Sequence, residues 1–205
     1  MSLVAGMLAG ADSIDDMGLL RHGGMPKVFH GVRAPSTLGT FLRGFAFGHV
    51  RQLDAVAARA LIGLAGQVPG LLAGAHGLVL LDIDDTVKAV FGAAKQGAQH
   101  GYTKVNGLNA QLATISTEQA APVIVSARLR RGAAASAHGA VRLVRDALVT
   151  TRRAGAIGPI LVRADSAYYQ HGFLTAVTRA GAWFSVGARQ DPAVRRAIAG
   201  IDPGS

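Results

Sequence analysis

Apolar residues recur at helical spacing through the first third of the chain. Pro35-Ser36-Thr37 predicts a helix start capped by Ser or Thr, and apolar residues follow three and four positions apart over 38–45. A second apolar stripe covers 50–64 and ends before Pro69-Gly70. Residues 1–75 are therefore predicted to form a helical N-terminal region.

The period shortens after residue 75, where the apolar run 77–84 predicts a buried strand. Further patterns predict strands over 111–116 and 122–129, a helix over 136–153, a strand over 160–164, a helix over 172–180 and a strand over 182–188. This β-β-β-α-β-α-β order predicts an α/β domain over 76–205. We expect a mixed sheet, with three antiparallel strands followed by two strands added through helices. Helices should cover the sheet, and no closing helix is expected after the fifth strand.

Composition narrows the classes of function. The chain has 205 residues and no cysteine, which excludes disulfides, thiolate metal sites and a cysteine nucleophile. The formal net charge of +9 favours a polyanionic partner such as nucleic acid. The apolar stretch over 70–81 is too short to span a bilayer, and the N-terminus lacks a basic signal-peptide region. We expect a soluble cytoplasmic protein with no membrane partner.

Acidic residues follow two of the predicted strands. Asp82-Ile83-Asp84-Asp85-Thr86 stands at the end of the first strand, and Asp165 ends the fourth. An acid at the end of an apolar strand lies at the carboxyl edge of the sheet, where open α/β sheets bind ligands. Two carboxylates brought together there would repel each other, and a divalent cation such as Mg²⁺ or Mn²⁺ would relieve the repulsion.

Several segments together resemble the insertion-sequence transposases of the DDE type. The resemblance rests on the following segments: Pro35-Ser36-Thr37-Leu38-Gly39, Phe41-Leu42-Arg43, Leu80-Leu81-Asp82-Ile83-Asp84-Asp85-Thr86-Val87, Phe91-Gly92, Lys95-Gln96-Gly97-Ala98, Gly101-Tyr102, Arg128-Leu129-Arg130-Arg131-Gly132, Arg163-Ala164-Asp165-Ser166-Ala167-Tyr168-Tyr169, Trp183-Phe184-Ser185-Val186 and Ala197-Ile198. They cover almost the whole chain in the family's order. No single motif is decisive, but their number makes the resemblance specific.

The resemblance implies an RNase H-like core that cleaves phosphodiester bonds and transfers DNA strands. In that family the first catalytic acid stands in an Asp-x-Thr context, which Asp84 matches, and the second ends the fourth strand, which matches Asp165. Both would be ligands of Mg²⁺ or Mn²⁺. The third acid is a Glu on a late helix, whereas the sequence has one glutamate, Glu118, before the third strand. The resemblance therefore implies a truncated, inactive fragment that ends before the last catalytic helix.

The partners implied are DNA, as element ends and as target, and another copy of the chain or a full-length transposase. Six basic residues are candidate contacts to DNA phosphates, although the resemblance assigns none of them: Lys95, Lys104, Arg128, Arg130, Arg131 and Arg163.

Two alternatives remain open at this point. Asp82-x-Asp84-x-Thr86 after an apolar strand also resembles the first motif of haloacid-dehalogenase-like phosphatases, in which Asp82 would be the nucleophile and Asp84 the general acid and base. Those enzymes alternate strands and helices from the start and need a later acidic pair, whereas Asp165 is followed by Ser166. The other alternative is a remnant that binds DNA without cutting it.

Overall fold

The computed structural model describes residues 1–91 and 95–201. The chain divides into two compact units, Met1–Gln52 and Leu53–Ser205. The boundary between them lies within the longest helix, α3 (Phe47–Gln67). The sequence pattern predicted a helical region over 1–75 and a separate domain over 76–205, and this division stays a prediction.

The first unit is helical, as its spacing predicted. It contains α1 (Ser2–Leu8), the 3₁₀ helices η1 (Asp15–Arg21) and η2 (Met25–Lys27), and α2 (Pro35–Arg43). The expected Ser or Thr cap of α2 is wrong. Ala34 occupies the cap position, and Pro35 fills the first turn, where its missing N–H has no partner to lose.

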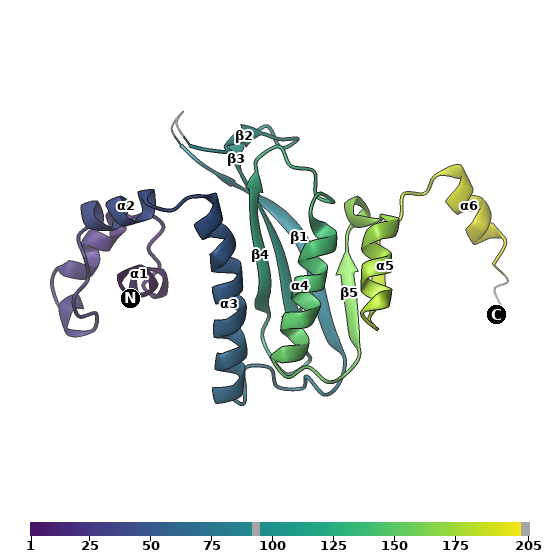
Figure 1. Cartoon of the computed structure of the whole chain (residues 1–205), viewed down its shortest axis with the longest axis horizontal. Helices are drawn as coiled ribbons and strands as arrows, with labels where there is room; N and C mark the ends of the chain where they lie inside the picture. Colours follow the sequence, from purple (N-terminus) through teal and green to yellow (C-terminus); the bar gives the residue numbers. More distant parts are fainter. Residues whose placement is uncertain (92–94, 202–205) are drawn as a thin grey trace. The chain divides into compact units, whose positions relative to one another are not determined.

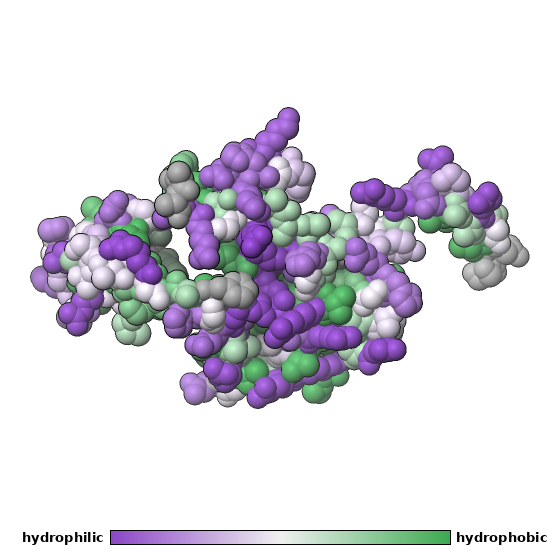
Figure 2. All heavy atoms as spheres, turned by 45° about the horizontal axis from the view of Figure 1, so that its top comes forward, coloured by the Kyte–Doolittle hydropathy of each residue, from purple (hydrophilic) through white to green (hydrophobic). Residues whose placement is uncertain are grey.

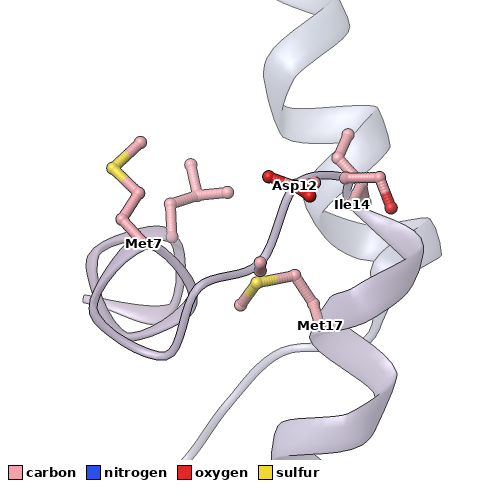
Figure 3. A pocket seen from close by; sticks show the side chains of 7 residues that line it. Met7, Asp12, Ile14 and Met17 are labelled. Atoms are coloured by element: carbon pink, nitrogen blue, oxygen red, sulfur yellow. The ribbon is translucent and has the colours of Figure 1, made fainter.

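Met17, Leu20 and Leu38 form a small core in this unit. Beside Met17 lies a cavity of about 260 Å³, lined by Leu3, Met7, Ala11, Asp12, Ser13, Ile14 and Met17 (Figure 3). Most of this lining is apolar, and its one charged side chain is that of Asp12. The lining has no arrangement of polar groups that would indicate a ligand, so we interpret the cavity as imperfect packing.

The second unit is built on a mixed sheet (Figure 1). Its strands are β1 (Val79–Ala89), β2 (Gln99–His100), β3 (Asn106–Ser116), β4 (Val123–Arg131), β5 (Ile160–Ala164) and β6 (Trp183–Val186). The order is β2-β3-β1-β5-β6, with β4 also paired to β3. β3 is antiparallel to both β1 and β4, whereas β5 is parallel to β1 and β6. This is the mixed arrangement that the sequence predicted, and a uniformly parallel sheet is excluded.

Two helices cover one face of the sheet. α4 (Ala140–Arg153) and α5 (His171–Arg179) bury their apolar sides against β1, β3 and β5, as α4 in front of the strands illustrates (Figure 1). The opposite face is not closed in the same way, since Leu129 and Trp183 are 44% and 63% exposed. The helices therefore cover the sheet less completely than we expected.

Several elements differ from the sequence prediction. β1 continues to Ala89, beyond the predicted end at 84, so Asp82, Asp84 and Asp85 lie within the strand and not at its end. β2 was not predicted, because a two-residue strand leaves no periodic signal. β3 begins at Asn106, five positions before the predicted start at 111, because polar side chains interrupt its apolar alternation. A further helix, α6 (Pro192–Ala199), follows β6 and has no buried residue. Figure 2 shows hydrophilic and hydrophobic atoms on different sides of α6. The predicted turn at Asp202–Ser205 lies outside the described residues.

Candidate functional site

The two candidate metal ligands occupy equivalent positions on neighbouring strands. β1 and β5 run parallel in a register that pairs Asp82 with Arg163 and Ile83 with Ala164. Asp84 follows Ile83 within β1, and Asp165 directly follows Ala164, the last residue of β5. The two acids, far apart in sequence, thus come immediately after a pair of register partners.

The alternation of side chains places both acids on the same face. In β1 the side chains of Leu81 and Ile83 are buried under the helices, so Asp84 faces the other way. In β5 Val162 is buried in the same core, so Arg163 faces the side of Asp84. Asp165 follows in an extended conformation and shares the face of Arg163. Both acids are exposed.

One backbone N–H orients each of these carboxylates. The amide of Asp85 donates to Asp84 Oδ1 over 2.7 Å. The amide of Ala167 donates to Asp165 Oδ1 over 3.0 Å, because Asp165 caps the short 3₁₀ helix η3 (Ser166–Tyr168). Each contact uses one oxygen and leaves the other oxygen of that carboxylate for further ligands.

The neighbouring acid Asp82 is paired with an arginine. Arg163 Nε donates to Asp82 Oδ1 over 2.6 Å and Nη2 donates to Oδ2 over 2.8 Å. The hydrogen bond to Asp82 raises the pKa of the Arg163 guanidinium. Because both oxygens of Asp82 accept from Arg163, Asp82 is less available as a metal ligand than Asp84.

The third acid of the motif, Asp85, points to the covered side of the sheet. Its side chain is 10% exposed. Its Oδ2 accepts a 2.8 Å hydrogen bond from Arg130 Nη2 and another from the side-chain amide of Asn109. Burial lowers the pKa of the Arg130 guanidinium, and the charge of Asp85 opposes that shift. Asp85 is therefore part of a buried ion pair, and Asp84 is the exposed acid in the Asp-x-Thr context.

The donor set at Asp84 and Asp165 fits a single hard cation. Mg²⁺ in proteins is commonly held by one or two carboxylates while water and substrate phosphates complete its shell. Over residues 1–91 and 95–201 no group of three His, Cys, Asp or Glu side chains is placed to hold a metal. Asp191 caps α6 and accepts from the amides of Ala193 and Val194, and Glu118 is exposed before β4.

The six basic candidates fall into two kinds. Lys95, Lys104 and Arg131 are exposed near the end of the sheet that carries β2, and Arg163 is 46% exposed beside Asp82. Arg128 is 11% exposed and forms an ion pair with Asp146. Arg130 is 8% exposed, with its guanidinium inside the protein. The four exposed side chains can reach DNA phosphates, whereas the buried guanidinium of Arg130 cannot.

Sequence reasoning missed the polar side chains beneath the site. Asn109 and Gln111 are buried on the covered face of β3, and Gln111 Nε2 donates to Ser136 O over 2.7 Å and to the Tyr168 hydroxyl over 3.4 Å. Burial raises the pKa of the Tyr168 phenol well above its usual value of 10.0. The available signal was the spacing of Asn109 and Gln111, which places both on the strand face that also carries Ala113 and Ile115.

No helix among the described residues is long and apolar enough to cross a membrane.

A family model described as transposase DDE domain, group 1, matches residues 1–203. No curated protein matches the sequence. Among solved structures, the Mos1 transposase paired-end complex with the left transposon end has a TM-score of 0.35 and 8% identity, over 84% of this chain and 56% of that one. The piggyBac transposase synaptic complex with hairpin DNA has a TM-score of 0.34 and 8% identity, over 60% of this chain and 26% of that one. The chain thus spans about a quarter to just over half of these transposases, and likenesses this low do not assign a function.

Proposed function

The chain belongs to the family of transposase DDE domains, group 1, and on this premise we propose that Asp84 and Asp165 are the first two metal-binding acids of a DNA transposase. The observation that supports the proposal is the parallel register of β1 and β5, which pairs Ile83 with Ala164, the residues immediately before the exposed Asp84 and Asp165. Nothing in the family match or in the mixed sheet supports a phosphatase.

Transposases of the DDE type depend on divalent metal ions, and we propose Mg²⁺ or Mn²⁺ for this chain. When bound, such an ion would lower the pKa of a water or 3′-hydroxyl nucleophile and stabilise the charge on the leaving oxygen. Asp84 and Asp165 would hold the ion by the oxygens that do not accept from Asp85 and Ala167. Neither acid needs to act as a general base.

The proposed substrate is DNA, as element ends and as target. The net charge of +9 favours binding to phosphates, and Lys95, Lys104 and Arg131 offer exposed cations at the β2 end of the sheet. Pairing with a second copy or with a full-length transposase is part of the same proposal, because transposition joins two element ends to one target.

Metal binding by the purified chain tests the site. Mn²⁺ affinity, followed by the electron paramagnetic resonance signal of the free ion, should fall by about tenfold or more in Asp84→Asn and in Asp165→Asn. A tenfold change corresponds to about 1.4 kcal/mol, which is modest for the loss of a charged ligand. Asp146→Asn is the matched control, because Asp146 is a half-exposed acid on α4 that pairs with arginine.

The proposal fails if Asp84→Asn and Asp165→Asn bind Mn²⁺ as tightly as the unmodified chain. Salt-dependent binding to DNA in the absence of an Asp84-dependent metal site would instead support a remnant that binds DNA without cutting it.

A further inference from the structure

Five polar side chains form a cluster inside the protein, on the face of the sheet opposite to the two exposed acids. This buried polar cluster consists of Asp85, Asn109, Gln111, Arg130 and Tyr168. Its members come from β1, β3, β4 and η3, so it ties together the strand that carries Asp84 and the turn that carries Asp165. Neither the proposed metal chemistry nor the family match assigns it a role.

Arg130 is the centre of the cluster. Its guanidinium donates to Asp85, to Asn109 Oδ1 and to three backbone carbonyls of the loop between β4 and α4. The carbonyl contacts are 2.9 Å to Ala135, 3.2 Å to Ser136 and 2.6 Å to His138. A planar guanidinium can satisfy so many acceptors only in one arrangement, so it holds Asp85 at a defined distance from β3 and from this loop.

Tyr168 is the second anchor. It is fully buried, its ring lies 5.7 Å from that of Phe173, and its hydroxyl accepts from Gln111 Nε2. Its backbone amide donates to the carbonyl of Asp165 over 3.2 Å. The turn that begins with Asp165 is therefore attached to β3 through Tyr168.

Two backbone amides connect the buried polar cluster to the proposed metal ligands. The amide that orients the Asp84 carboxylate belongs to Asp85, whose side chain is held by Arg130. The amide that orients the Asp165 carboxylate belongs to Ala167, the residue immediately before Tyr168. Each carboxylate thus accepts from a peptide group anchored at or next to a member of the buried polar cluster.

We propose that Arg130 and Tyr168 are positioning residues, which fix the separation and orientation of the Asp84 and Asp165 carboxylates so that the pair selects a small divalent cation. The inference rests on the proposed metal site. In this cluster the buried oxygen Gln111 Oε1 has no hydrogen-bond partner, whereas Asp85 and Arg130 are paired. Displacing such a buried network leaves charged or polar groups unpaired in a low-dielectric interior, so the network favours one geometry. Such rigidity favours Mg²⁺ or Mn²⁺, which demand short and regular coordination, over Ca²⁺, which accepts longer and irregular contacts.

The test compares affinities for Mn²⁺ and Ca²⁺ in the whole chain. Tyr168→Phe keeps the packing against Phe173 and removes only the hydroxyl, and Arg130→Lys keeps the charge but cannot reach every acceptor. Both variants should lose Mn²⁺ affinity by about 10–100-fold, the usual effect of losing a group that orients a ligand, while Ca²⁺ affinity changes less. Tyr102→Phe and Arg142→Lys are the matched controls, because Tyr102 is 90% exposed and the side chain of Arg142 is 71% exposed.

A general loss of stability would weaken both ions alike, so the Mn²⁺-to-Ca²⁺ preference separates positioning from folding. Hydrogen exchange of the Asp85 and Ala167 amides supplies a second readout without metal, and both should exchange faster in the two variants. The inference is overturned if folded Tyr168→Phe and Arg130→Lys keep the preference of the unmodified chain and its slow exchange. Absence of Asp84-dependent Mn²⁺ binding in the unmodified chain would remove the proposed site itself and this inference with it.

Discussion

Arg163 and Asp82 are register partners on β5 and β1, and two hydrogen bonds of 2.6 and 2.8 Å join their side chains. The pair lies on the same face as Asp84, two positions away along β1. It engages both oxygens of Asp82 and places a fixed positive charge beside the proposed metal ligands. The pair is also half-exposed, at 46% and 39%, so its contribution to stability is small.

Arg163→Gln should leave Mn²⁺ affinity unchanged or raise it. The substitution removes a cation near the site and frees the carboxylate of Asp82, and both effects favour a bound divalent ion. Titration of Mn²⁺ into the two proteins at equal ionic strength measures the change. Weaker binding in the variant would show that Arg163 supports the site rather than repelling its ion.

Strand-specific nicking of DNA by the 205-residue chain should depend on Asp84 and Asp165. A two-metal displacement clamps the attacking and the leaving oxygen, and these two acids are the ones proposed to hold metal. Incubation with Mn²⁺ and DNA that carries candidate element ends, for the unmodified chain and for Asp84→Asn, measures the dependence. Nicks that persist in Asp84→Asn would contradict the proposed site, and Asp191, whose carboxylate caps α6, would be the next acid to replace.

DNA binding should weaken steeply with salt and depend on the exposed cations at the β2 end of the sheet. Replacing Lys104 or Arg131 by Gln should reduce the slope of log affinity against log salt by about one each, because each phosphate contact releases about one counterion. Fluorescence anisotropy with duplexes of unrelated sequence measures the slope. Arg142→Gln serves as control, because Arg142 lies on α4 and pairs with Asp146. Equal slopes for all variants would place the DNA elsewhere.

Gly132→Ala should destabilise the second unit by about 1–3 kcal/mol, the usual cost of forcing an extra methyl group into close packing. A Cβ at this position would fall on the backbone oxygens of Gly107 and Gln99, which cannot retreat without breaking strand pairs. Urea unfolding measures the loss. Gly63→Ala is the control, because a Cβ at this position in α3 would meet open space. This substitution should raise the free energy of unfolding by about 0.5–1 kcal/mol, since alanine favours the helix more than glycine does.

Tyr168 should make stability fall at alkaline pH. Burial raises the pKa of its phenol above the unfolded value of 10.0, so the native state favours the neutral form. The stability that depends on this neutral form is fully present below pH 10.0 and is lost as pH rises through the native pKa. Unfolding free energies measured from neutral to strongly alkaline pH should fall more steeply in the unmodified chain than in Tyr168→Phe. If the unfolding free energies of the two proteins fall equally with pH, the raised pKa of the Tyr168 phenol is contradicted.

Local pattern was enough for most of the elements that carry the site. β5 spans Ile160–Ala164 as predicted, because a short apolar run between turn residues can hardly form anything else. α4 and α5 begin and end within a few residues of their predicted limits, since each has one continuous apolar stripe. The same patterns predicted the mixed sheet and the acid that follows β5. The acids expected at the end of β1 lie within it, because the strand continues to Ala89.

Only the tertiary structure decided what each acid of Asp82-Ile83-Asp84-Asp85 does. Strand alternation places the side chain of Asp85 on the covered face, where it pairs with Arg130, 45 positions away in sequence. Asp82 lies on the other face and pairs with Arg163, 81 positions away. Such partners are set by strand register, which no local pattern contains, because a shift of one residue would exchange the two faces. The sequence by itself determined that acids stand on the first strand and directly after β5, and pairing between distant strands determined that Asp84 is the one left exposed.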